Sequence, residues 1–300
     1  MLRIELAEQL ARLTPREGFT ESPVPGLRLY RQNSPTTEPL PVIYDPSICV
    51  IAQGSKDLAF GERTITYDPW HYVVNPLTLP TEATIAEATP ERPFLGFLVR
   101  FDPVDLGKLL AEIDEHLEWP SDSPGQAIDA SAMDRPMVAA LHRLIGSLDD
   151  PADRRVLAPA LMREVLYTVL RGPLGHILRE QATRGGSAHR VGRAVAFLER
   201  HFHESLDIET IADKAAMSPS ALHHHFKRLT ALSPMQYVQR LRLHRARSLL
   251  LGGRAAAEAG FEVGYNSPSQ FSREFRRLFG HPPSRRRQSP ADVSSSRPVA

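Results

Sequence analysis

The sequence predicts a two-domain α+β protein, with a β-rich domain first and an all-helical domain second. Short apolar segments separated by Gly, Pro, Asp and Asn occupy most of residues 26–101, a pattern typical of an antiparallel barrel or sandwich. From Asp102 onward, apolar residues recur at helical spacing instead. The length of 300 residues fits two domains, and an apolar fraction of 42% is enough to give each of them a core.

The β-rich part is predicted to hold seven strands behind one short helix. The helix covers residues 3–13, and the strands follow at 27–32, 47–54, 56–61, 63–68, 71–76, 82–88 and 93–101. The second pair of these strands forms a predicted hairpin that turns at Gly61 and Glu62. Further helices are predicted after Asp102-Pro103, which is a good helix start, and over 134–148 and 151–171.

Four segments follow from this pattern. Residues 1–182 form the β-rich domain with its C-terminal helices, and the small, polar, Gly-rich stretch 183–189 is the predicted linker. Residues 190–287 form the helical domain. Residues 288–300, rich in Ser, Arg and Pro, are expected to be a disordered tail.

Charge divides the chain at the same place. Residues 183–300 carry 19 Lys and Arg against 9 Asp and Glu, a net of +10, whereas residues 1–182 carry 17 against 26, a net of −9. The formal net charge of +1 therefore combines an acidic front with a basic back. Such asymmetry points to a polyanion partner for the basic domain. Charge alone leaves open a solvated basic domain that has no such partner.

Cysteine content and hydropathy indicate where in the cell the protein is expected. Cys49 is the sole cysteine, which excludes an intramolecular disulfide and any Cys-rich zinc module. No run approaches 18 apolar residues, and the N-terminal segment lacks the continuous apolar stretch of a secretory signal. We therefore expect a cytoplasmic protein with no membrane partner.

The helical domain contains an internal repeat with an offset of 49 residues. SPSALHHHFKRL begins at Ser218 and SPSQFSREFRRL at Ser267, each with Ser as N-cap and Pro at the first helical position. Apolar residues coincide at i, i+4 and i+7, which defines one buried helix face. A shorter helix and a small turn residue, Ala216 or Gly264, precede each copy. Two copies in register predict a pair of helix-turn-helix motifs rather than ordinary helical hairpins.

A helix of eighteen residues is predicted between the copies, starting at Pro234. At 1.5 Å per residue it forms a rod about 27 Å long. Tyr237, Leu241, Ala246 and Leu250 are expected to face the two motifs. Such a rod would hold two recognition helices roughly one DNA turn apart, about 34 Å, so that both enter successive major grooves.

Residues 190–287 resemble the DNA-binding domain of AraC/XylS-type transcriptional regulators, most clearly in the block GYNSPSQFSREFRRLFGHPP. The stretch DPSICVIAQGSKDLAFGERTITYDPWHYVVNPLTLP is similar to the N-terminal cupin-like barrel of one AraC-type subgroup. The resemblance implies a cupin-like effector and dimerisation domain that controls a DNA-binding domain. One departure is Ala259-Gly260, where family members carry Ile-Ala or Ala-Ala. Glycine inside a helix costs about 1 kcal/mol relative to alanine, so the second motif is expected to be softer than the first.

The resemblance also places DNA-contacting side chains on both recognition helices. Base-reading positions fall on Ser220, His223 and His224 in the first copy and on Ser269, Gln270, Ser272 and Arg273 in the second, while Lys227, Arg276 and Arg277 suit phosphates. Arg273 is the strongest candidate, because arginine pairs bidentately with guanine. Adjacent helical residues point about 100° apart, so His223-His224-His225 is not expected to hold a metal ion.

The barrel is expected to hold a small ligand, as antiparallel barrels commonly do. Candidate lining residues are Tyr30, Cys49, Phe60, Tyr67, Trp70, Tyr72 and Phe97. Cys49 is either a small buried apolar residue or a sensor thiol. His71 stands alone among the strands, and no cupin-type His-x-His with a following Glu occurs, so neither a metal nor another cofactor is expected.

These patterns predict a sequence-specific transcription regulator, an activator that binds double-stranded DNA and responds to an effector of unknown identity. A homodimer is expected, with its seam on the helices of residues 134–171, and RNA polymerase is a candidate partner. No Ser/His/Asp or paired-carboxylate pattern points to catalysis, so an enzyme is not expected. Two alternatives stay open: a metal-independent cupin-type enzyme with a fused helical domain, and a non-specific architectural DNA binder.

Overall fold

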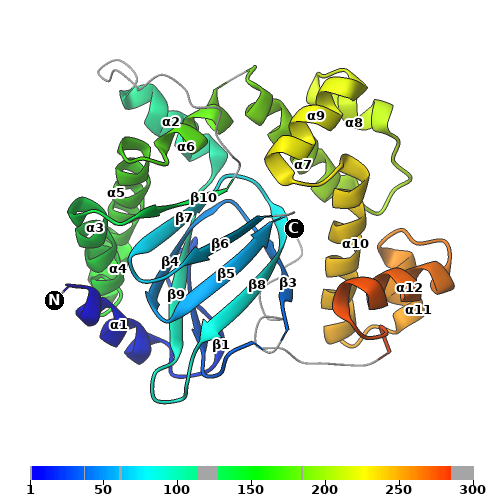
Figure 1. Cartoon of the computed structure of the whole chain (residues 1–300). Coiled ribbons are helices and arrows are strands. Elements are labelled where there is room, and N and C mark those ends of the chain that lie inside the picture. The colour runs from blue at the N-terminus through cyan, green and yellow to red at the C-terminus, as the bar shows by residue number, and fades with distance from the viewer. Residues whose placement is uncertain (1, 37, 61–62, 114–127, 184, 285–300) are drawn as a thin grey trace.

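The computed structural model describes residues 2–36, 38–60, 63–113, 128–183 and 185–284. A β-barrel stands in the middle, with one group of helices on its N-terminal side and the C-terminal helical half on the other (Figure 1). The predicted two-domain α+β architecture is confirmed. The predicted turn at Gly61-Glu62 and the predicted tail 288–300 lie outside the described residues. None of the described helices is both long enough and apolar enough to cross a membrane.

Two antiparallel sheets build the barrel. One has the strand order β1-β2-β9-β4-β7-β10 and the other the order β3-β8-β5-β6. The strands are β1 (Gly18–Glu21), β2 (Leu27–Gln32), β3 (Leu40–Tyr44), β4 (Ser47–Gln53), β5 (Ser55–Phe60), β6 (Arg63–Tyr67), β7 (His71–Asn75), β8 (Leu79–Glu87), β9 (Phe94–Arg100) and β10 (Asp129–Ala132). The seven predicted strands are present, and β1, β3 and β10 were missed. Those three have only four or five residues each, too few to show a clear alternation.

Side-chain alternation divides the six-stranded sheet between two cores. Tyr30, Cys49 and Phe94 point between the sheets, into the barrel interior. Leu29, Ile48 and Phe97 belong to the opposite core, against the N-terminal group of helices. That group comprises α1 (Leu2–Leu13), α2 (Pro103–Ile113), α3 (Arg135–Gly146), α4 (Pro151–Val156), α5 (Ala158–Arg171) and α6 (Gly175–Ala182).

The predicted helix over 151–171 is two helices, so this prediction needs correction. The break falls at Leu157, between α4 and α5. Pro159 explains it, because proline has no N–H to donate and restricts the residue before it. The apolar stripe of α5 is also largely used inside the chain. Val165 and Leu166 are buried, while Val156 and Leu157 remain 70% and 46% exposed.

The C-terminal half places one helix-turn-helix motif at each end of a central rod (Figure 1). Its helices are α7 (Ser187–His201), α8 (Ile208–Ala215), α9 (Pro219–Thr230), α10 (Pro234–Leu251), α11 (Ala256–Glu262) and α12 (Pro268–Phe279). The rod α10 has the eighteen residues that the sequence predicts. Tyr237 and Leu241 pack in the core of the first motif, and Ala246 and Leu250 pack in the core of the second.

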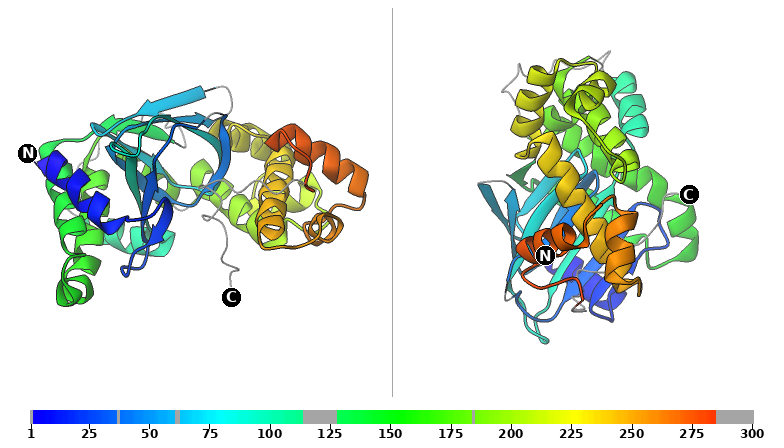
Figure 2. Two further views of the ribbon diagram at one scale, coloured as in Figure 1. Left: turned by 90° about the horizontal axis from the view of Figure 1, so that it is seen from below. Right: turned by 90° about the vertical axis from the view of Figure 1, so that its right-hand side faces the viewer.

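The C-terminal half packs directly on the barrel. Because α6 ends at Ala182 and α7 begins at Ser187, the connection is shorter than the predicted 183–189 linker. Figure 2 shows α10 crossing the barrel wall. The Tyr237 hydroxyl donates to the Thr78 carbonyl oxygen at 2.9 Å, a contact between residues 159 positions apart. The first motif and the barrel interior therefore share one continuous apolar core.

Candidate nucleic-acid interface and barrel pocket

The exposed faces of α9 and α12 form the candidate nucleic-acid interface. Each helix buries its apolar stripe, Leu222 and Phe226 in α9 and Phe271 and Phe275 in α12. The ten predicted DNA-contacting side chains are all exposed on these two helices: Ser220, His223, His224, Lys227, Ser269, Gln270, Ser272, Arg273, Arg276 and Arg277. Both faces are therefore available to a groove, with the basic residues concentrated on α12.

Serine caps fix where each recognition helix begins. Ser218 Oγ accepts from the Ala221 N–H at 3.3 Å, and Ser267 Oγ accepts from the Gln270 N–H at 3.3 Å. The N-terminal turn of such a helix presents free N–H groups, which favour a phosphate. Gln270 Nε2 also donates to Glu274 Oε1 at 3.1 Å. Its amide would have to leave this carboxylate before it could read a base.

The turn of the second motif depends on Gly264. This residue has φ of +91°, and a Cβ placed on it would lie 2.4 Å from the His203 carbonyl oxygen. The turn therefore packs directly on the segment that follows α7. The corresponding residue of the first motif, Ala216, has φ of +52° and caps α8. Glycine is required at 264 because a Cβ would collide with the His203 carbonyl oxygen, and the positive φ adds strain for any other residue.

Arg242 of α10 joins the same two segments, a role that no sequence pattern indicated. Its Nε donates to the Phe202 carbonyl at 2.6 Å, Nη1 to the Gly264 carbonyl at 3.2 Å and Nη2 to the Glu204 carbonyl at 2.6 Å. One guanidinium thus ties the central rod to the segment between α7 and α8 and to the turn of the second motif. It fixes how the two motifs are placed relative to one another.

Gly260 is a packing residue, where the sequence suggested only a source of looseness. It is buried in α11, and a Cβ at this position would lie 2.9 Å from Cδ1 of Phe271. The Phe271 ring is itself 1% exposed. Glycine therefore lets α11 approach the recognition helix α12 closely, which is the compensation for its poor helix propensity.

A cavity of about 60 Å³ lies inside the barrel. Of the predicted ligand-pocket residues, Tyr30, Cys49 and Tyr67 line it with inward-facing side chains. Phe97 borders it, but its side chain packs on the helix side of the sheet. Two predictions were wrong: Tyr72 also faces the helices, because of strand alternation, and Trp70 is 61% exposed outside the barrel. The side chain of Phe60 lies outside the described part of the chain.

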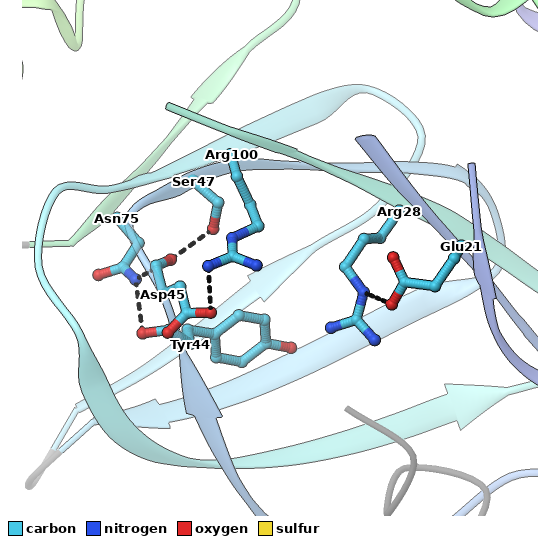
Figure 3. Close-up of polar contacts among 7 residues, drawn as sticks. All are labelled: Glu21, Arg28, Tyr44, Asp45, Ser47, Asn75 and Arg100. Carbon is cyan, nitrogen blue, oxygen red and sulfur yellow. Dashed lines mark hydrogen bonds and ion pairs between the residues drawn. The ribbon is translucent and has the colours of Figure 1, made fainter. Parts of the chain in front are cut away.

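Three basic side chains reach the cavity, which the sequence analysis missed. Arg28 and Arg100 each meet a carboxylate, Glu21 at 2.7 Å and Asp45 at 2.9 Å (Figure 3). The third is Lys56, whose Nζ donates to the Tyr44 hydroxyl. Strand alternation could have revealed it, since Lys56 and the buried Leu58 are two residues apart and so share a face.

The corner between β3 and β4 is held by several polar contacts. Asn75 Nδ2 donates to the carbonyl oxygens of Tyr44 and Asp45, at 3.3 and 3.0 Å. Ser47 Oγ donates to the Asp45 carbonyl at 2.8 Å, and Arg100 bonds the Asp45 carboxylate (Figure 3). This corner therefore has a defined conformation at the mouth of the barrel, close to the Thr78 carbonyl that receives the Tyr237 hydroxyl.

The geometry disfavours a reactive Cys49 thiol. Burial raises the pKa of Cys49 to about 11, although Ser47 and Lys56 act in the opposite direction. A thiol of this kind is almost entirely protonated at neutral pH, and the thiolate is the reactive form. His71 lies outside any metal-binding constellation in the described residues: its Nδ1 contacts Asp68 Oδ1 at 2.8 Å.

The fold and the paired motifs define a helix-turn-helix DNA-binding regulator. Residues 23–177 match the family model of the AraC-type transcriptional regulator N-terminus, and residues 211–289 match a helix-turn-helix domain. The first match alone covers more than half of the chain. The chain belongs to the AraC-type transcriptional regulators, which makes it a regulator rather than an enzyme.

Named relatives agree with this assignment. The transcriptional activator RhaS of Citrobacter koseri is 29% identical over 183 residues, which are 60% of this chain and 64% of RhaS. RhaS of Escherichia fergusonii is 31% identical over 58% of this chain and 62% of its own length. The chain thus matches just under two thirds of the length of these relatives. A structure of ToxT from Vibrio cholerae with bound unsaturated fatty acid has a TM-score of 0.56 at 12% identity, covering 90% of this chain and 95% of ToxT. That likeness shows a shared fold.

Proposed function

We propose that this protein is a transcription activator that reads a bipartite operator through α9 and α12. The observation that carries the proposal is the pair of exposed, Ser-capped recognition helices at the two ends of one eighteen-residue rod. Arg273 would read guanine on the second half-site, while Lys227, Arg276 and Arg277 would hold phosphates. Base reading by the predicted residues would distinguish this function from architectural binding, which uses backbone contacts and DNA deformation.

The barrel would receive the effector, and a second copy would complete the regulator. The cavity supports effector binding by the barrel, because it lies inside the barrel on which α10 packs. Val156 and Leu157 support dimerisation, because both side chains are exposed and apolar on the N-terminal domain, and a second copy would cover them. RNA polymerase remains the candidate partner for activation. The expected domains are the barrel with its helices up to residue 182 and the DNA-binding half from residue 190.

The test is selection of bound fragments from the source genome by the full chain, followed by a footprint on the tightest fragment. We expect protection over two successive major grooves on one face of the duplex. A salt series with this fragment and with scrambled DNA of equal length separates specific from non-specific binding. Equal affinity for both DNAs over the whole series would refute base reading and favour the architectural alternative.

A matched pair of variants assigns the contacts. Arg273→Ala should weaken binding to the selected fragment and leave binding to scrambled DNA almost unchanged. Arg200→Ala is the control, because Arg200 lies on α7, which is not a recognition helix, and its Nε donates to the Ala196 carbonyl of the same helix. If both variants behave alike, Arg273 does not read a base.

A further inference from the structure

Glu274 is the only acidic residue in the sequence of the recognition helix α12, and different neighbours hold its two oxygens. Tyr265, in the turn that precedes α12, donates its hydroxyl to Oε2 at 2.7 Å. Gln270, one helical turn earlier, donates Nε2 to Oε1 at 3.1 Å. The side chain of Gln239 on the rod α10 bonds the same carboxylate. Glu274 therefore joins the turn and the rod to a predicted base-reading side chain.

Packing fixes the Tyr265 end of this network. Tyr265 is 5% exposed, and its ring lies 5.3 Å from the buried ring of Phe271. Its hydroxyl therefore has a defined position, and so has the oxygen that accepts from it. Burial acts to raise the pKa of Glu274, but three hydrogen bonds and the nearby charge of Arg277 lower it overall. The carboxylate is thus ionised at neutral pH, and an ionised acceptor forms stronger hydrogen bonds than a neutral one.

Helix geometry separates Gln270 from the centre of the exposed face of α12. Successive residues of an α-helix are about 100° apart around its axis. Arg273 lies about 160° from the buried Phe271 and Phe275, which places it near the middle of the exposed face. Gln270 lies about 60° from Arg273 and about 40° from Glu274. The hydrogen bond to Glu274 therefore draws the Gln270 amide toward the edge of this face and away from Arg273.

An adenine contact would use both polar ends of the Gln270 amide. Glutamine reads adenine through a bidentate pair, in which its oxygen accepts from N6 and its Nε2 donates to N7. To form that pair, the amide has to give up its charge-assisted hydrogen bond to Glu274. The loss of this bond offsets the gain from the base, so an adenine at this position brings little net affinity.

We propose that Glu274 is a positioning residue that holds Gln270 away from the bases, so that Gln270 adds nothing to the base preference of the second half-site. The proposal rests on the proposed function, since it concerns the base pairs that the second motif distinguishes. Glu274 itself contacts no base and acts through Gln270. Arg273, at the centre of the same face, keeps its role as the reader of guanine.

The experiment measures the affinities of the full chain for a set of related operators. Each base pair of the second half-site in the selected genomic fragment is changed to the three others, and gel shifts give the affinity for every operator. Gln270→Ala alone should leave the base preferences unchanged. Glu274→Ala should create a preference for adenine of about five-fold or more at one base pair, because the freed amide can form the bidentate pair. Adding Gln270→Ala to Glu274→Ala should abolish this preference.

Three controls separate the release of Gln270 from other effects of the substitution. The lost negative charge strengthens binding to all DNAs alike, and a uniform gain cancels from a ratio of affinities. Tyr265→Phe removes the donor to Oε2 of Glu274 and keeps the Gln270 bond to Oε1, so it should lower Tm without creating the adenine preference. Glu274→Gln keeps the side-chain shape without the charge and should produce the same preference to a smaller extent. Should Glu274→Ala fail to fold by circular dichroism, Glu274→Gln carries the test.

Three results would overturn the inference. A changed preference for Gln270→Ala alone would show that Gln270 reads a base despite Glu274. Unchanged preferences for Glu274→Ala would show that no base contact had been prevented. The same new preference in Tyr265→Phe would assign the effect to the packing of α12.

Arg273→Ala, measured on the same operators, distinguishes this inference from the proposed function. If Arg273→Ala removes a preference and Glu274→Ala changes none, only the role of Glu274 is refuted. If the unchanged protein prefers no operator over scrambled DNA, the proposed function itself fails.

Discussion

Replacing Arg242 should uncouple the two helix-turn-helix motifs. Its guanidinium donates to three backbone carbonyls, those of Phe202, Glu204 and Gly264. The contacts to Phe202 and Gly264 are part-buried and the one to Glu204 is exposed. Hydrogen bonds from a charged donor contribute about 1.5 kcal/mol or more each where they are shielded, and less where water competes. Arg242→Ala should therefore lower the free energy of unfolding of the C-terminal half by about 3–4 kcal/mol.

The assay combines denaturant unfolding, followed by circular dichroism, with DNA binding at a temperature where the variant is folded. The variant should lose more affinity for a two-half-site operator than for either half-site alone, because the spacing of the motifs is no longer fixed. Arg242→Lys should recover only part of the stability, since an ammonium lacks the planar fork that reaches three carbonyls at once. Arg200→Ala, which removes one exposed bond within α7, should change either quantity little. An unchanged unfolding midpoint for Arg242→Ala would refute this role.

Four further outcomes can be measured on the same protein. Arg273→Ala should weaken the free energy of binding to the selected operator by about 1–3 kcal/mol and relax the preference at one base pair. Arg276→Ala should instead weaken binding to all DNAs alike. Gel shifts on operators with single-base changes distinguish the two outcomes. Gly260→Ala gains about 1 kcal/mol in helix propensity but overpacks the core by about 1–3 kcal/mol, so a stabilised variant would contradict the packing argument. His244 is buried, and burial lowers its pKa to about 3. As the pH falls, the histidine is therefore protonated in the unfolded chain before it is protonated in the folded protein. Unfolding free energy should then fall by up to about 1.4 kcal/mol per pH unit below 6.5, and His244→Leu should lack this slope. Cys49 should react with a thiol reagent only when the protein unfolds, and rapid labelling of the native protein would revive the sensor reading.

Local patterns predicted the elements that local chemistry determines. Ser218 and Ser267 cap their helices as the repeat indicated, and α10 has its predicted length because Ser233-Pro234 starts it and Gly252 ends it. Strands with clear alternation were found for the same reason. Leu157 shows the limit of periodicity, since an unbroken apolar stripe runs across the break that Pro159 imposes.

Contacts between residues distant in sequence could not be predicted from local patterns. Nothing near Tyr237 indicates that its hydroxyl meets the Thr78 carbonyl, and nothing near Arg242 indicates its three acceptors. The same holds for the ligand pocket, where aromatic character selected Trp70 and Tyr72 but the parity of each residue in its strand decides which face it occupies. Lys56 shows how strand parity could have been used: it lies two residues from the buried Leu58, so both side chains point to the same face, inside the barrel.

The position of β3 explains why the DNA-binding half packs on the barrel at all. β3 lies at the edge of its sheet, and an uncovered edge strand offers unpaired backbone groups to other chains. Pro41 removes one donor from this edge, and Arg247 of α10 occupies its carbonyl oxygen. Arg240 adds a contact to Glu82 at 3.6 Å on the neighbouring strand β8. One face of β3 thus forms the cavity wall through Tyr44, while its edge holds α10. A displacement of Tyr44 would therefore act on a strand against which α10 packs.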